Sequence, residues 1–294
     1  MKPCVMKGCN GPVGLQYALP NFDVLQCERC KMLYQDPFPD SEKLREMYDS
    51  PDYVESGYFT ATETGPAKER PEVEIYRSGL KCLADQHPAV NSTGRGSLLD
   101  VGCGSGLFLQ MARDDGWQVE GVEISSHHAE RARREKGLTV HEGEFDRMEI
   151  EGAAFDAITL WDLLEHVVRP EDTLERARSL LSPGGSLLVF TINSASLLNQ
   201  LAHAGHRLTR GLISRPIELL YDAHHCFYFT EQTLANLVSR SGFEILERYN
   251  YRAHLNRWLI EPAPAWMRAG TEVVDWLSIP LNRQYRQAIL CRPC

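Results

Sequence analysis

The stretch Leu98–Leu109, LLDVGCGSGLFL, decides how the rest of the chain is interpreted. Its opening residues predict a buried strand, the glycines Gly102, Gly104 and Gly106 a turn, and its end the start of a helix. Glycine adopts positive φ and leaves space beside the backbone, while the first turn of a helix presents free N–H groups. The stretch therefore predicts a cradle for a polar ligand at the carboxyl end of a first parallel strand.

Length and composition are those of an ordinary globular protein. The chain has 294 residues, of which 43% are apolar and 24% charged, enough for one large domain or two smaller ones. The formal charge of −9 argues against a dedicated nucleic-acid binder, which needs clustered basic residues. One local basic run is interpreted as a solvated helix face; it consists of Arg131, Arg133, Arg134 and Lys136.

Neither a membrane segment nor an export signal is expected. No apolar run approaches the roughly 20 residues of a membrane span. The first ten residues, MKPCVMKGCN, have no apolar signal-peptide core. The nine cysteines are therefore expected to be thiols or metal ligands rather than disulfides, and the expected compartment is cytoplasmic.

Residues 1–35 predict a small zinc ribbon. Cys4 and Cys9 form a C-x4-C pair, and Cys27 and Cys30 form a C-x2-C pair 17 residues later. Two such pairs supply four thiolates to one tetrahedral zinc, and the sequence between them alternates enough to form a hairpin. Four unrelated thiols are the alternative. A zinc here would be structural, since four cysteines leave no open coordination position.

Residues 36–96 are interpreted as a connector and a helical N-terminal cap. A short helix is expected first and a longer one over 71–86, followed by a loop. Tyr48, Tyr53 and Tyr58 recur every five residues, so they do not share one helical face. They either line a substrate cavity or pack the connector onto the main domain.

Residues 97–294 alternate between strand and helix, which predicts an α/β fold with a parallel sheet covered on both faces. The expected strands are 98–101, 117–124, 138–141, 155–161, 186–192, 243–251 and 286–292. The expected helices are 106–115, 126–136, 171–181 and 230–241, and Pro183-Gly184-Gly185 is expected to form a tight turn. Two insertions, about 193–229 and 252–284, are long enough to be lids. The second carries Trp258, Trp266 and Trp276, which either cap an apolar substrate or form an oligomer contact.

Two features narrow the ligand of the glycine turn. Glu123 is expected at the end of the second strand, where a carboxylate accepts hydrogen bonds from ribose hydroxyls. The glycine spacing is G-x-G-x-G, whereas a dinucleotide fingerprint is G-x-G-x-x-G. The tighter loop suits an adenosine ligand without phosphates and disfavours a nicotinamide oxidoreductase.

Five motifs in order, DVGCGSG, GVEIS, FDAITLWDLLEHV, LLSPGGSLLVFT and SGFEIL, resemble the class I S-adenosylmethionine-dependent methyltransferases. The resemblance covers about 97–251 and the last strand. It implies a Rossmann-like, seven-stranded, mostly parallel sheet whose last strand is antiparallel, with helices on both faces. The cysteine-rich segment followed by DPFPD-SEKLREMY is similar to a subgroup with an N-terminal zinc ribbon, many of whose members act on sugars or secondary metabolites.

The resemblance also implies roles for individual positions. The glycine turn would hold the methionine and ribose, Glu123 the ribose hydroxyls, and Gly143-Glu144-Phe145 the adenine. Glu144 stands where the family usually has Asp, and Phe145 where it has a small residue; Asn193 ends a Thr-Ile-Asn in place of Thr-Pro-Asn. The implied cofactor-binding set is Asp100, Gly102, Cys103, Gly104, Gly106, Glu123, Ile124, Glu144, Phe145, Trp161 and Asp162.

Methyl transfer is an in-line displacement in which the enzyme aligns a nucleophile, removes its proton where needed and excludes water. Histidine is the usual base. His225 is the preferred candidate, ahead of His224 and His166, with packing of a lid as the alternative for the first two. His127 and His128 are expected at the surface. Cys103 is expected to serve close packing, and Cys226 is not taken as a nucleophile.

The sequence thus predicts methyl transfer from S-adenosylmethionine to an O, N or C nucleophile of a small molecule. One alternative is a methyltransferase that grips RNA or protein through the ribbon, although the ribbon has few basic residues. Another is a cofactor-binding protein without catalysis. Self-association is left open, and the acceptor depends on the insertions, which the motifs do not describe.

Overall fold

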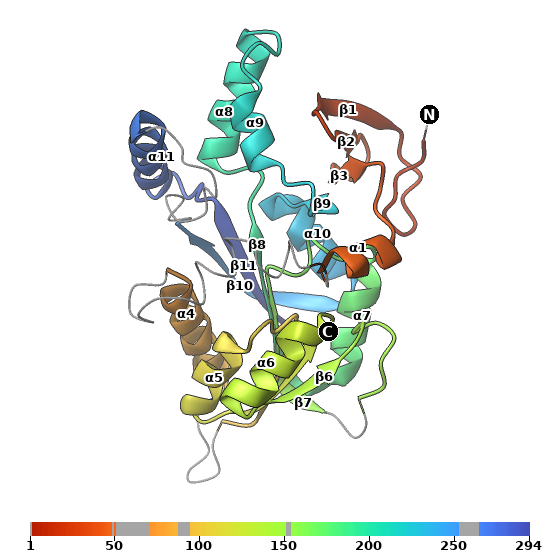
Figure 1. The fold of residues 1–294 in the computed structure, drawn as a ribbon, viewed down its shortest axis with the longest axis vertical. Helices are drawn as coiled ribbons and strands as arrows, with labels where there is room; N and C mark the ends of the chain where they lie inside the picture. Colours follow the sequence, from red (N-terminus) through yellow and green to blue (C-terminus); the bar gives the residue numbers. More distant parts are fainter. Residues whose placement is uncertain (1, 49, 51–70, 88–94, 151–153, 253–264) are drawn as a thin grey trace.

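A seven-stranded sheet forms the centre of the computed structural model, which describes residues 2–48, 50, 71–87, 95–150, 154–252 and 265–294 (Figure 1). Its strands are β4 (Ser97–Val101), β5 (Gln118–Glu123), β6 (Thr139–Glu142), β7 (Phe155–Trp161), β8 (Leu181–Ile192), β10 (Phe243–Tyr251) and β11 (Arg286–Pro293). They lie in the order β10-β11-β8-β7-β4-β5-β6, and β11 is antiparallel to both of its neighbours. The predicted sheet, with its antiparallel last strand, is confirmed.

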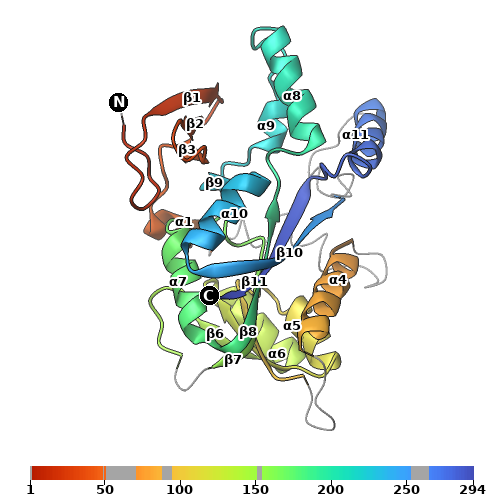
Figure 2. The ribbon, with the colours of Figure 1, turned by 180° about the vertical axis from the view of Figure 1, so that it is seen from behind.

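Helices cover both faces of this sheet because its strands bury side chains on alternate sides. On β8, Leu188 and Phe190 belong to the core beneath α4 (Pro71–Gln86), α5 (Leu107–Asp114) and α6 (Ser126–Lys136). Leu187 and Val189 belong to the core beneath α7 (Pro170–Leu180) and α10 (Glu231–Arg240). Figure 2 shows the second group of helices from the other side.

One element, β8, begins several residues earlier than expected. β8 starts at Leu181, so it includes the predicted Pro183-Gly184-Gly185 turn. The pairing of β7 with β8 explains the difference: Phe155 pairs with Leu181 and Ala157 with Ser186, which leaves extra residues on β8. Gly184 takes a φ of 85° in this stretch, so the turn is present as an irregularity within the strand.

A second, smaller sheet joins the N-terminus to the first insertion. Its strands are β1 (Val13–Ala18), β2 (Asp23–Cys27), β3 (Leu33–Asp36) and β9 (Phe227–Tyr228), in that order. The first three form the expected hairpin-based ribbon, whereas β9 comes from the insertion and pairs antiparallel with β3. The insertion is therefore held to the ribbon by backbone hydrogen bonds, a contact that the sequence did not predict.

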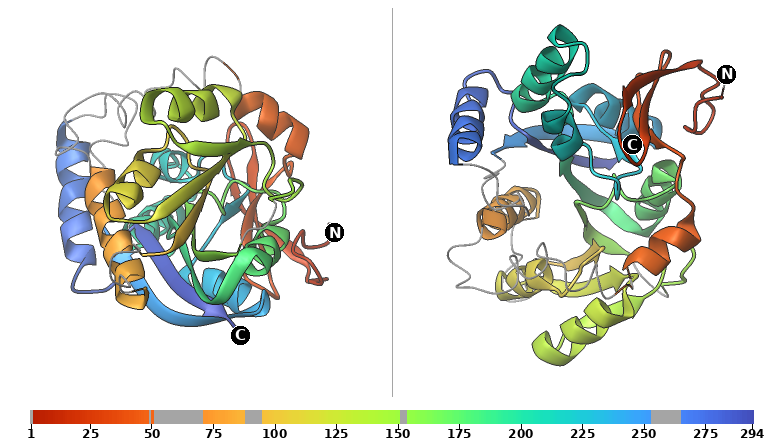
Figure 3. Two further views of the ribbon diagram at one scale, coloured as in Figure 1. Left: turned by 90° about the horizontal axis from the view of Figure 1, so that it is seen from below. Right: turned by 45° about the horizontal axis from the view of Figure 1, so that its top comes forward.

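The remaining helices are α1 (Ser41–Tyr48), α8 (Leu197–Leu208), α9 (Arg215–Leu220) and α11 (Ala265–Ser278). The ribbon and α8 lie side by side, where Tyr17 Oη and His203 Nδ1 are 2.6 Å apart (Figure 3, right). Trp276 is exposed, with the Arg252 guanidinium 4.0 Å from its ring centre. Tyr53, Tyr58, Trp258 and the Trp266 side chain lie outside the described residues. Among the described helices, none combines the length and the apolar character needed to cross a bilayer.

Candidate functional site

The glycine turn after β4 has the backbone that its sequence requires. Gly102, Gly104 and Gly106 take φ values of 76°, 52° and 80°, all in the left-handed region that favours glycine. A Cβ on Gly102 would lie 3.0 Å from Leu163 Cδ1, whereas a Cβ on Gly104 would meet nothing within 4 Å. The turn is therefore packed at one glycine and open at the next.

Glu123 closes this turn from the neighbouring strand. At the end of β5, its carboxylate accepts hydrogen bonds from Gly104 N–H (2.7 Å) and Ser125 N–H (2.9 Å). The side chain is buried. Two backbone donors compensate the buried charge and fix both carboxylate oxygens at the edge of the turn.

Asp100, the last but one residue of β4, is buried beneath the turn. Thr159 Oγ1 donates a 2.6 Å hydrogen bond to its Oδ1. Burial, reinforced by the charge of Glu123, raises the pKa of Asp100 to about 8, although the Thr159 hydrogen bond acts in the opposite direction.

A cavity of about 310 Å³ lies against the turn. All the predicted cofactor positions except Gly106 line it, including Ile124, Glu144 and Phe145. Its wall contains Trp161, whose ring centre lies 4.9 Å from Tyr76, 5.0 Å from Phe108 and 5.2 Å from Phe190. Tyr48 also lines the cavity, in agreement with one of the two roles expected for it.

One histidine prediction is wrong. His128 is 3% exposed and lines the cavity, whereas His127 is exposed as expected. The reason is that α6 begins directly after Glu123–Ser125, so its first turn faces the cavity as well as the sheet. Asn193, by contrast, lies outside the cavity wall: its side chain accepts a hydrogen bond from Ala195 N–H and donates one to Gln284 O.

Neither cysteine near the site is suited to nucleophilic attack. Cys103 lines the cavity, but its sulfur packs where a Cβ on Gly121 would lie, and burial raises its pKa well above the usual value. Cys226 is fully buried, its sulfur is 3.2 Å from His166 O, and burial raises its pKa to about 12. Thiolate is the reactive form, so both groups are inert at neutral pH.

The loop after β7 also lines the cavity, next to the glycine turn. Asp162 takes a left-handed φ of 46° and pairs with Arg286 at the start of β11, and its backbone N–H donates to Phe190 O. His166 also lines the cavity. Arg286 is 5% exposed and was missed in the sequence, because a basic residue at the start of a last strand carries no motif of its own.

The three candidate histidines gather beside this loop. His166 Nδ1 is 3.1 Å from His224 O, and the rings of His166 and His225 lie edge to face with centres 4.6 Å apart. Burial lowers the pKa of His166 and lowers that of His225 to about 3. His224 Nδ1 lies 2.7 Å from Asp222 Oδ1, and this contact raises the pKa of His224. His224 and His225 are adjacent to the cavity wall without forming part of it.

Glu165, which the sequence analysis did not single out, is buried between these histidines. Its backbone carbonyl accepts hydrogen bonds from Cys226 N–H (2.7 Å) and Phe227 N–H (3.1 Å). Ligand atoms of Glu165, His166 and His225 all lie within 4.8 Å of one another. The only signal in the sequence was its position beside His166 in LLEHVV.

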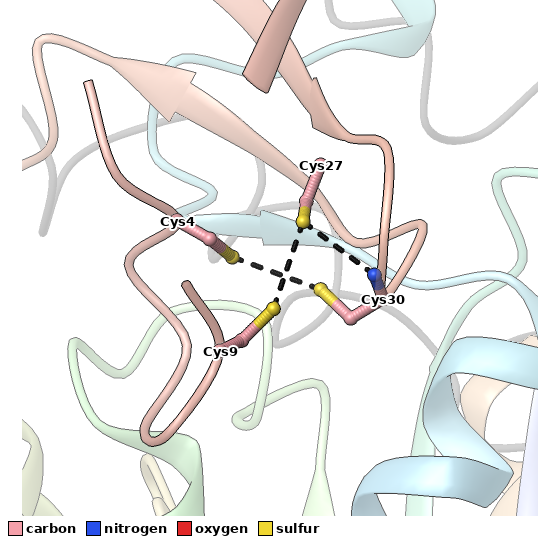
Figure 4. Close-up of side chains that lie close together, drawn as sticks. All are labelled: Cys4, Cys9, Cys27 and Cys30. Atoms are coloured by element: carbon pink, nitrogen blue, oxygen red, sulfur yellow. Dashed lines mark hydrogen bonds between the residues drawn. The ribbon is translucent and has the colours of Figure 1, made fainter. Parts of the chain in front are cut away.

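The sulfur atoms of the four ribbon cysteines point toward one another within the N-terminal segment (Figure 4). Cys4 Sγ lies 3.7 Å from Cys30 Sγ, and Cys9 Sγ lies 3.7 Å from Cys27 Sγ. All four are free thiols. A tetrahedron with zinc–sulfur arms of about 2.3 Å has edges of about 3.8 Å, so these separations match a zinc site.

Comparison with known proteins identifies relatives of the central domain. A family described as a methyltransferase domain matches residues 73–248. The ubiquinone biosynthesis O-methyltransferase of Xanthomonas axonopodis pv. citri (strain 306) is 33% identical over 154 residues, which are 50% of this chain and 62% of that protein. The chain spans about half the length of the curated relatives it matches.

Solved structures are similar in fold. Magnesium protoporphyrin IX methyltransferase from Synechocystis PCC 6803 with bound SAH has a TM-score of 0.57 at 13% identity, covering 87% of this chain and 100% of that chain. The [4+2]-cyclase SpnF has a TM-score of 0.56 at 20% identity, covering 87% and 97%. Because one of the two is a cyclase, the likeness describes the fold and leaves the reaction to the site.

Proposed function

Because the chain belongs to the methyltransferase domain family, we propose that it transfers a methyl group from S-adenosylmethionine to a nucleophilic atom of a small molecule. The observation that carries this proposal is the cradle in which Glu123 holds Gly104 N–H beside an open cavity. A carboxylate at the end of the second strand, next to a glycine turn, is suited to the ribose of an adenosine ligand.

The residues present fit this cofactor. The space beside Gly104 leaves room for a ligand against the backbone, and Asp100 and Glu123 present carboxyl oxygens that can accept hydrogen bonds from its polar groups. Ile124, Glu144 and Phe145 line the cavity where an adenine would be held. When bound, S-adenosylmethionine supplies a methyl group activated by a positively charged sulfur.

The acceptor is proposed to be a small molecule that enters beside Asp162 and His166. An oxygen nucleophile is favoured because the curated relatives are named O-methyltransferases. The aromatic wall around Trp161 suits an apolar or ring-shaped acceptor. A sugar or a secondary metabolite agrees with both features.

We propose that three histidines beside the cavity activate the acceptor: His166, His224 and His225. His225 is a weak base, since its pKa is lowered to about 3. His224 is better suited to receive a proton, because Asp222 orients its ring and raises its pKa. His166 contributes to the cavity wall itself. We therefore assign proton transfer to His224 and positioning of the acceptor to His166 and His225.

The ribbon is proposed to hold one structural zinc through Cys4, Cys9, Cys27 and Cys30, on the strength of the sulfur separations. Binding of RNA by the ribbon has less support. Lys2 pairs with Asp36, and Lys7 pairs with Asp172 and Glu175, so these two ribbon charges are compensated within the chain. Phosphate binding needs uncompensated basic groups.

The test is calorimetric titration of the full chain with S-adenosylhomocysteine, followed by incubation with S-adenosylmethionine and a panel of small hydroxylated acceptors. The expected results are one binding site per chain and a mass increase of one methyl group on an acceptor. Absence of binding would overturn the proposal. Binding without transfer to any acceptor would favour the non-catalytic alternative.

A further inference from the structure

We propose that Glu165, His166 and His225 bind a divalent metal ion that positions the nucleophilic oxygen of the acceptor. This site is separate from the ribbon cysteines. The inference rests on the proposed function for the identity of the reaction, but the metal site is argued from its own geometry.

The three side chains converge from two segments. Glu165 and His166 are consecutive in the loop after β7, and His225 comes from the segment that leads into β9. Their ligand atoms lie within 4.8 Å of one another, and the two imidazole rings meet edge to face. Two imidazoles and one carboxylate are a common donor set for divalent transition metals.

The environment of the Glu165 carboxyl group favours a bound cation. This side chain is 2% exposed, and neither carboxylate oxygen has a hydrogen-bond partner among the described residues. A buried carboxylate without a partner is costly, and proteins normally compensate it with hydrogen bonds or a cation. Arg286, which pairs with Asp162, and the Thr191 side chain both favour the charged form of Glu165, but burial outweighs them.

The surrounding backbone orients the ligands. His166 Nδ1 faces the carbonyl of His224, which can only accept a hydrogen bond, so Nδ1 carries the proton and Nε2 keeps its lone pair. A carbonyl that fixes the tautomer in this way is a usual partner of a metal-binding histidine. The hydrogen bonds from Cys226 and Phe227 N–H to Glu165 O hold the segment of His225 against the loop of Glu165.

The donor set also indicates which metals fit. Imidazole and carboxylate suit Mn²⁺, Fe²⁺, Co²⁺ or Zn²⁺, whereas the four thiolates of the ribbon select zinc. Three protein ligands leave coordination positions open. His166 lines the cavity beside Asp162, so the open side is available to an acceptor. There a bound cation would lower the pKa of an acceptor hydroxyl, whose proton would pass to water by way of His224. The acceptor oxygen would then take the methyl group of S-adenosylmethionine, and S-adenosylhomocysteine would be the leaving group.

Manganese binding to the full chain tests this inference, because Mn²⁺ is poorly held by thiolates and leaves the ribbon zinc in place. The loss of the free-ion electron paramagnetic resonance signal counts bound Mn²⁺. The wild-type chain should bind about one Mn²⁺, and Glu165→Gln and His225→Asn should each weaken binding by more than about tenfold. Glu149→Gln and His127→Asn change exposed side chains of the same types and should bind as the wild type does.

S-adenosylhomocysteine titration of each variant shows whether it is folded. If Glu165→Gln does not fold, His225→Asn provides the same comparison. Equal Mn²⁺ binding by the wild type and both folded variants, or no binding by the wild type, would overturn the metal site. If S-adenosylhomocysteine binds and Mn²⁺ does not, only this inference fails. Mn²⁺ binding that depends on Glu165, without any cofactor binding, would preserve the metal site and refute the proposed function.

Discussion

Glu123 accepts a 2.7 Å hydrogen bond from the backbone N–H of Gly104, nineteen positions earlier in the chain. Through this contact the end of β5 determines the shape of the turn that follows β4. The carboxylate has a second fixed oxygen, held by Ser125 N–H. The same side chain therefore organises the turn and borders the cavity.

Replacing Glu123 should weaken cofactor binding. Glu123→Ala removes the acceptor of two backbone donors, and hydrogen bonds to charged groups contribute about 1.5–3 kcal/mol each. We expect the Kd for S-adenosylhomocysteine to rise by about 10- to 100-fold, measured by calorimetry. Glu120→Gln, on the same strand but paired with His141 outside the cavity, is the matched control. An equal loss in both variants would contradict the assignment.

Asp100 should make the stability of the ligand-free chain depend on pH. Its pKa is about 8 when folded and 3.8 in its ordinary state, so the folded chain binds more protons between these values. Its contribution to the free energy of unfolding should therefore decrease as the pH rises from about 4 to 8 and stay constant above. Asp100→Asn, neutral throughout, should flatten this dependence in urea unfolding at several pH values. Parallel curves for the two proteins would show that the pKa is not raised.

Loss of the zinc proposed for the ribbon should impair the reaction with the acceptor more than the binding of the cofactor. Cys27→Ser with Cys30→Ser should reduce the zinc content from about one per chain to none. Because β3 pairs with β9, next to His225, we expect kcat/KM for the acceptor to fall by more than about tenfold. The S-adenosylhomocysteine Kd should change by less than about twofold, since the glycine turn is on other strands.

The exposed Cys294→Ser serves as the control for the ribbon variant. A parallel loss of cofactor binding would mean instead that the ribbon stabilises the whole chain.

Two helical glycines should respond to alanine in opposite directions. A Cβ on Gly79 would lie 2.5 Å from the Trp161 ring, so Gly79→Ala should destabilise the chain by about 1–3 kcal/mol. A Cβ on Gly205 would meet nothing within 4 Å, so Gly205→Ala should stabilise it by about 0.5–1 kcal/mol. Thermal or urea unfolding measures both. A neutral Gly79→Ala would show that α4 can move away from the cavity wall.

Local patterns in the sequence predicted the strands and helices of the central domain, and the family resemblance predicted the antiparallel last strand and most of the residues that line the cavity. Strand β7 and helix α4 have the predicted bounds, because alternation of buried residues and end signals are encoded within each segment. Asp100 and Glu123 were identified because they occupy fixed positions relative to a glycine turn.

Long-range contacts could not be predicted in the same way. The pairing of Tyr34 with Phe227 joins residues far apart in the chain, and neither two-residue β9 nor its partner carries a signal for the other. The burial of His128 depends on how α6 meets the sheet. The role proposed for Glu165 could not be predicted from the sequence, because it depends on His225, which lies near Glu165 only in the folded chain.

The pairing of β3 with β9 also means that the N-terminal segment cannot be removed without exposing part of the first insertion. A chain shortened to begin after Asp36 would lose three strands and leave the backbone edge of β9 exposed beside the histidines. During synthesis, the ribbon leaves the ribosome long before Phe227, so β3 cannot pair with β9 until that later segment has been made. A ribbon exchanged for that of a related protein would therefore have to preserve the pairing with β9, although the two segments are distant in sequence.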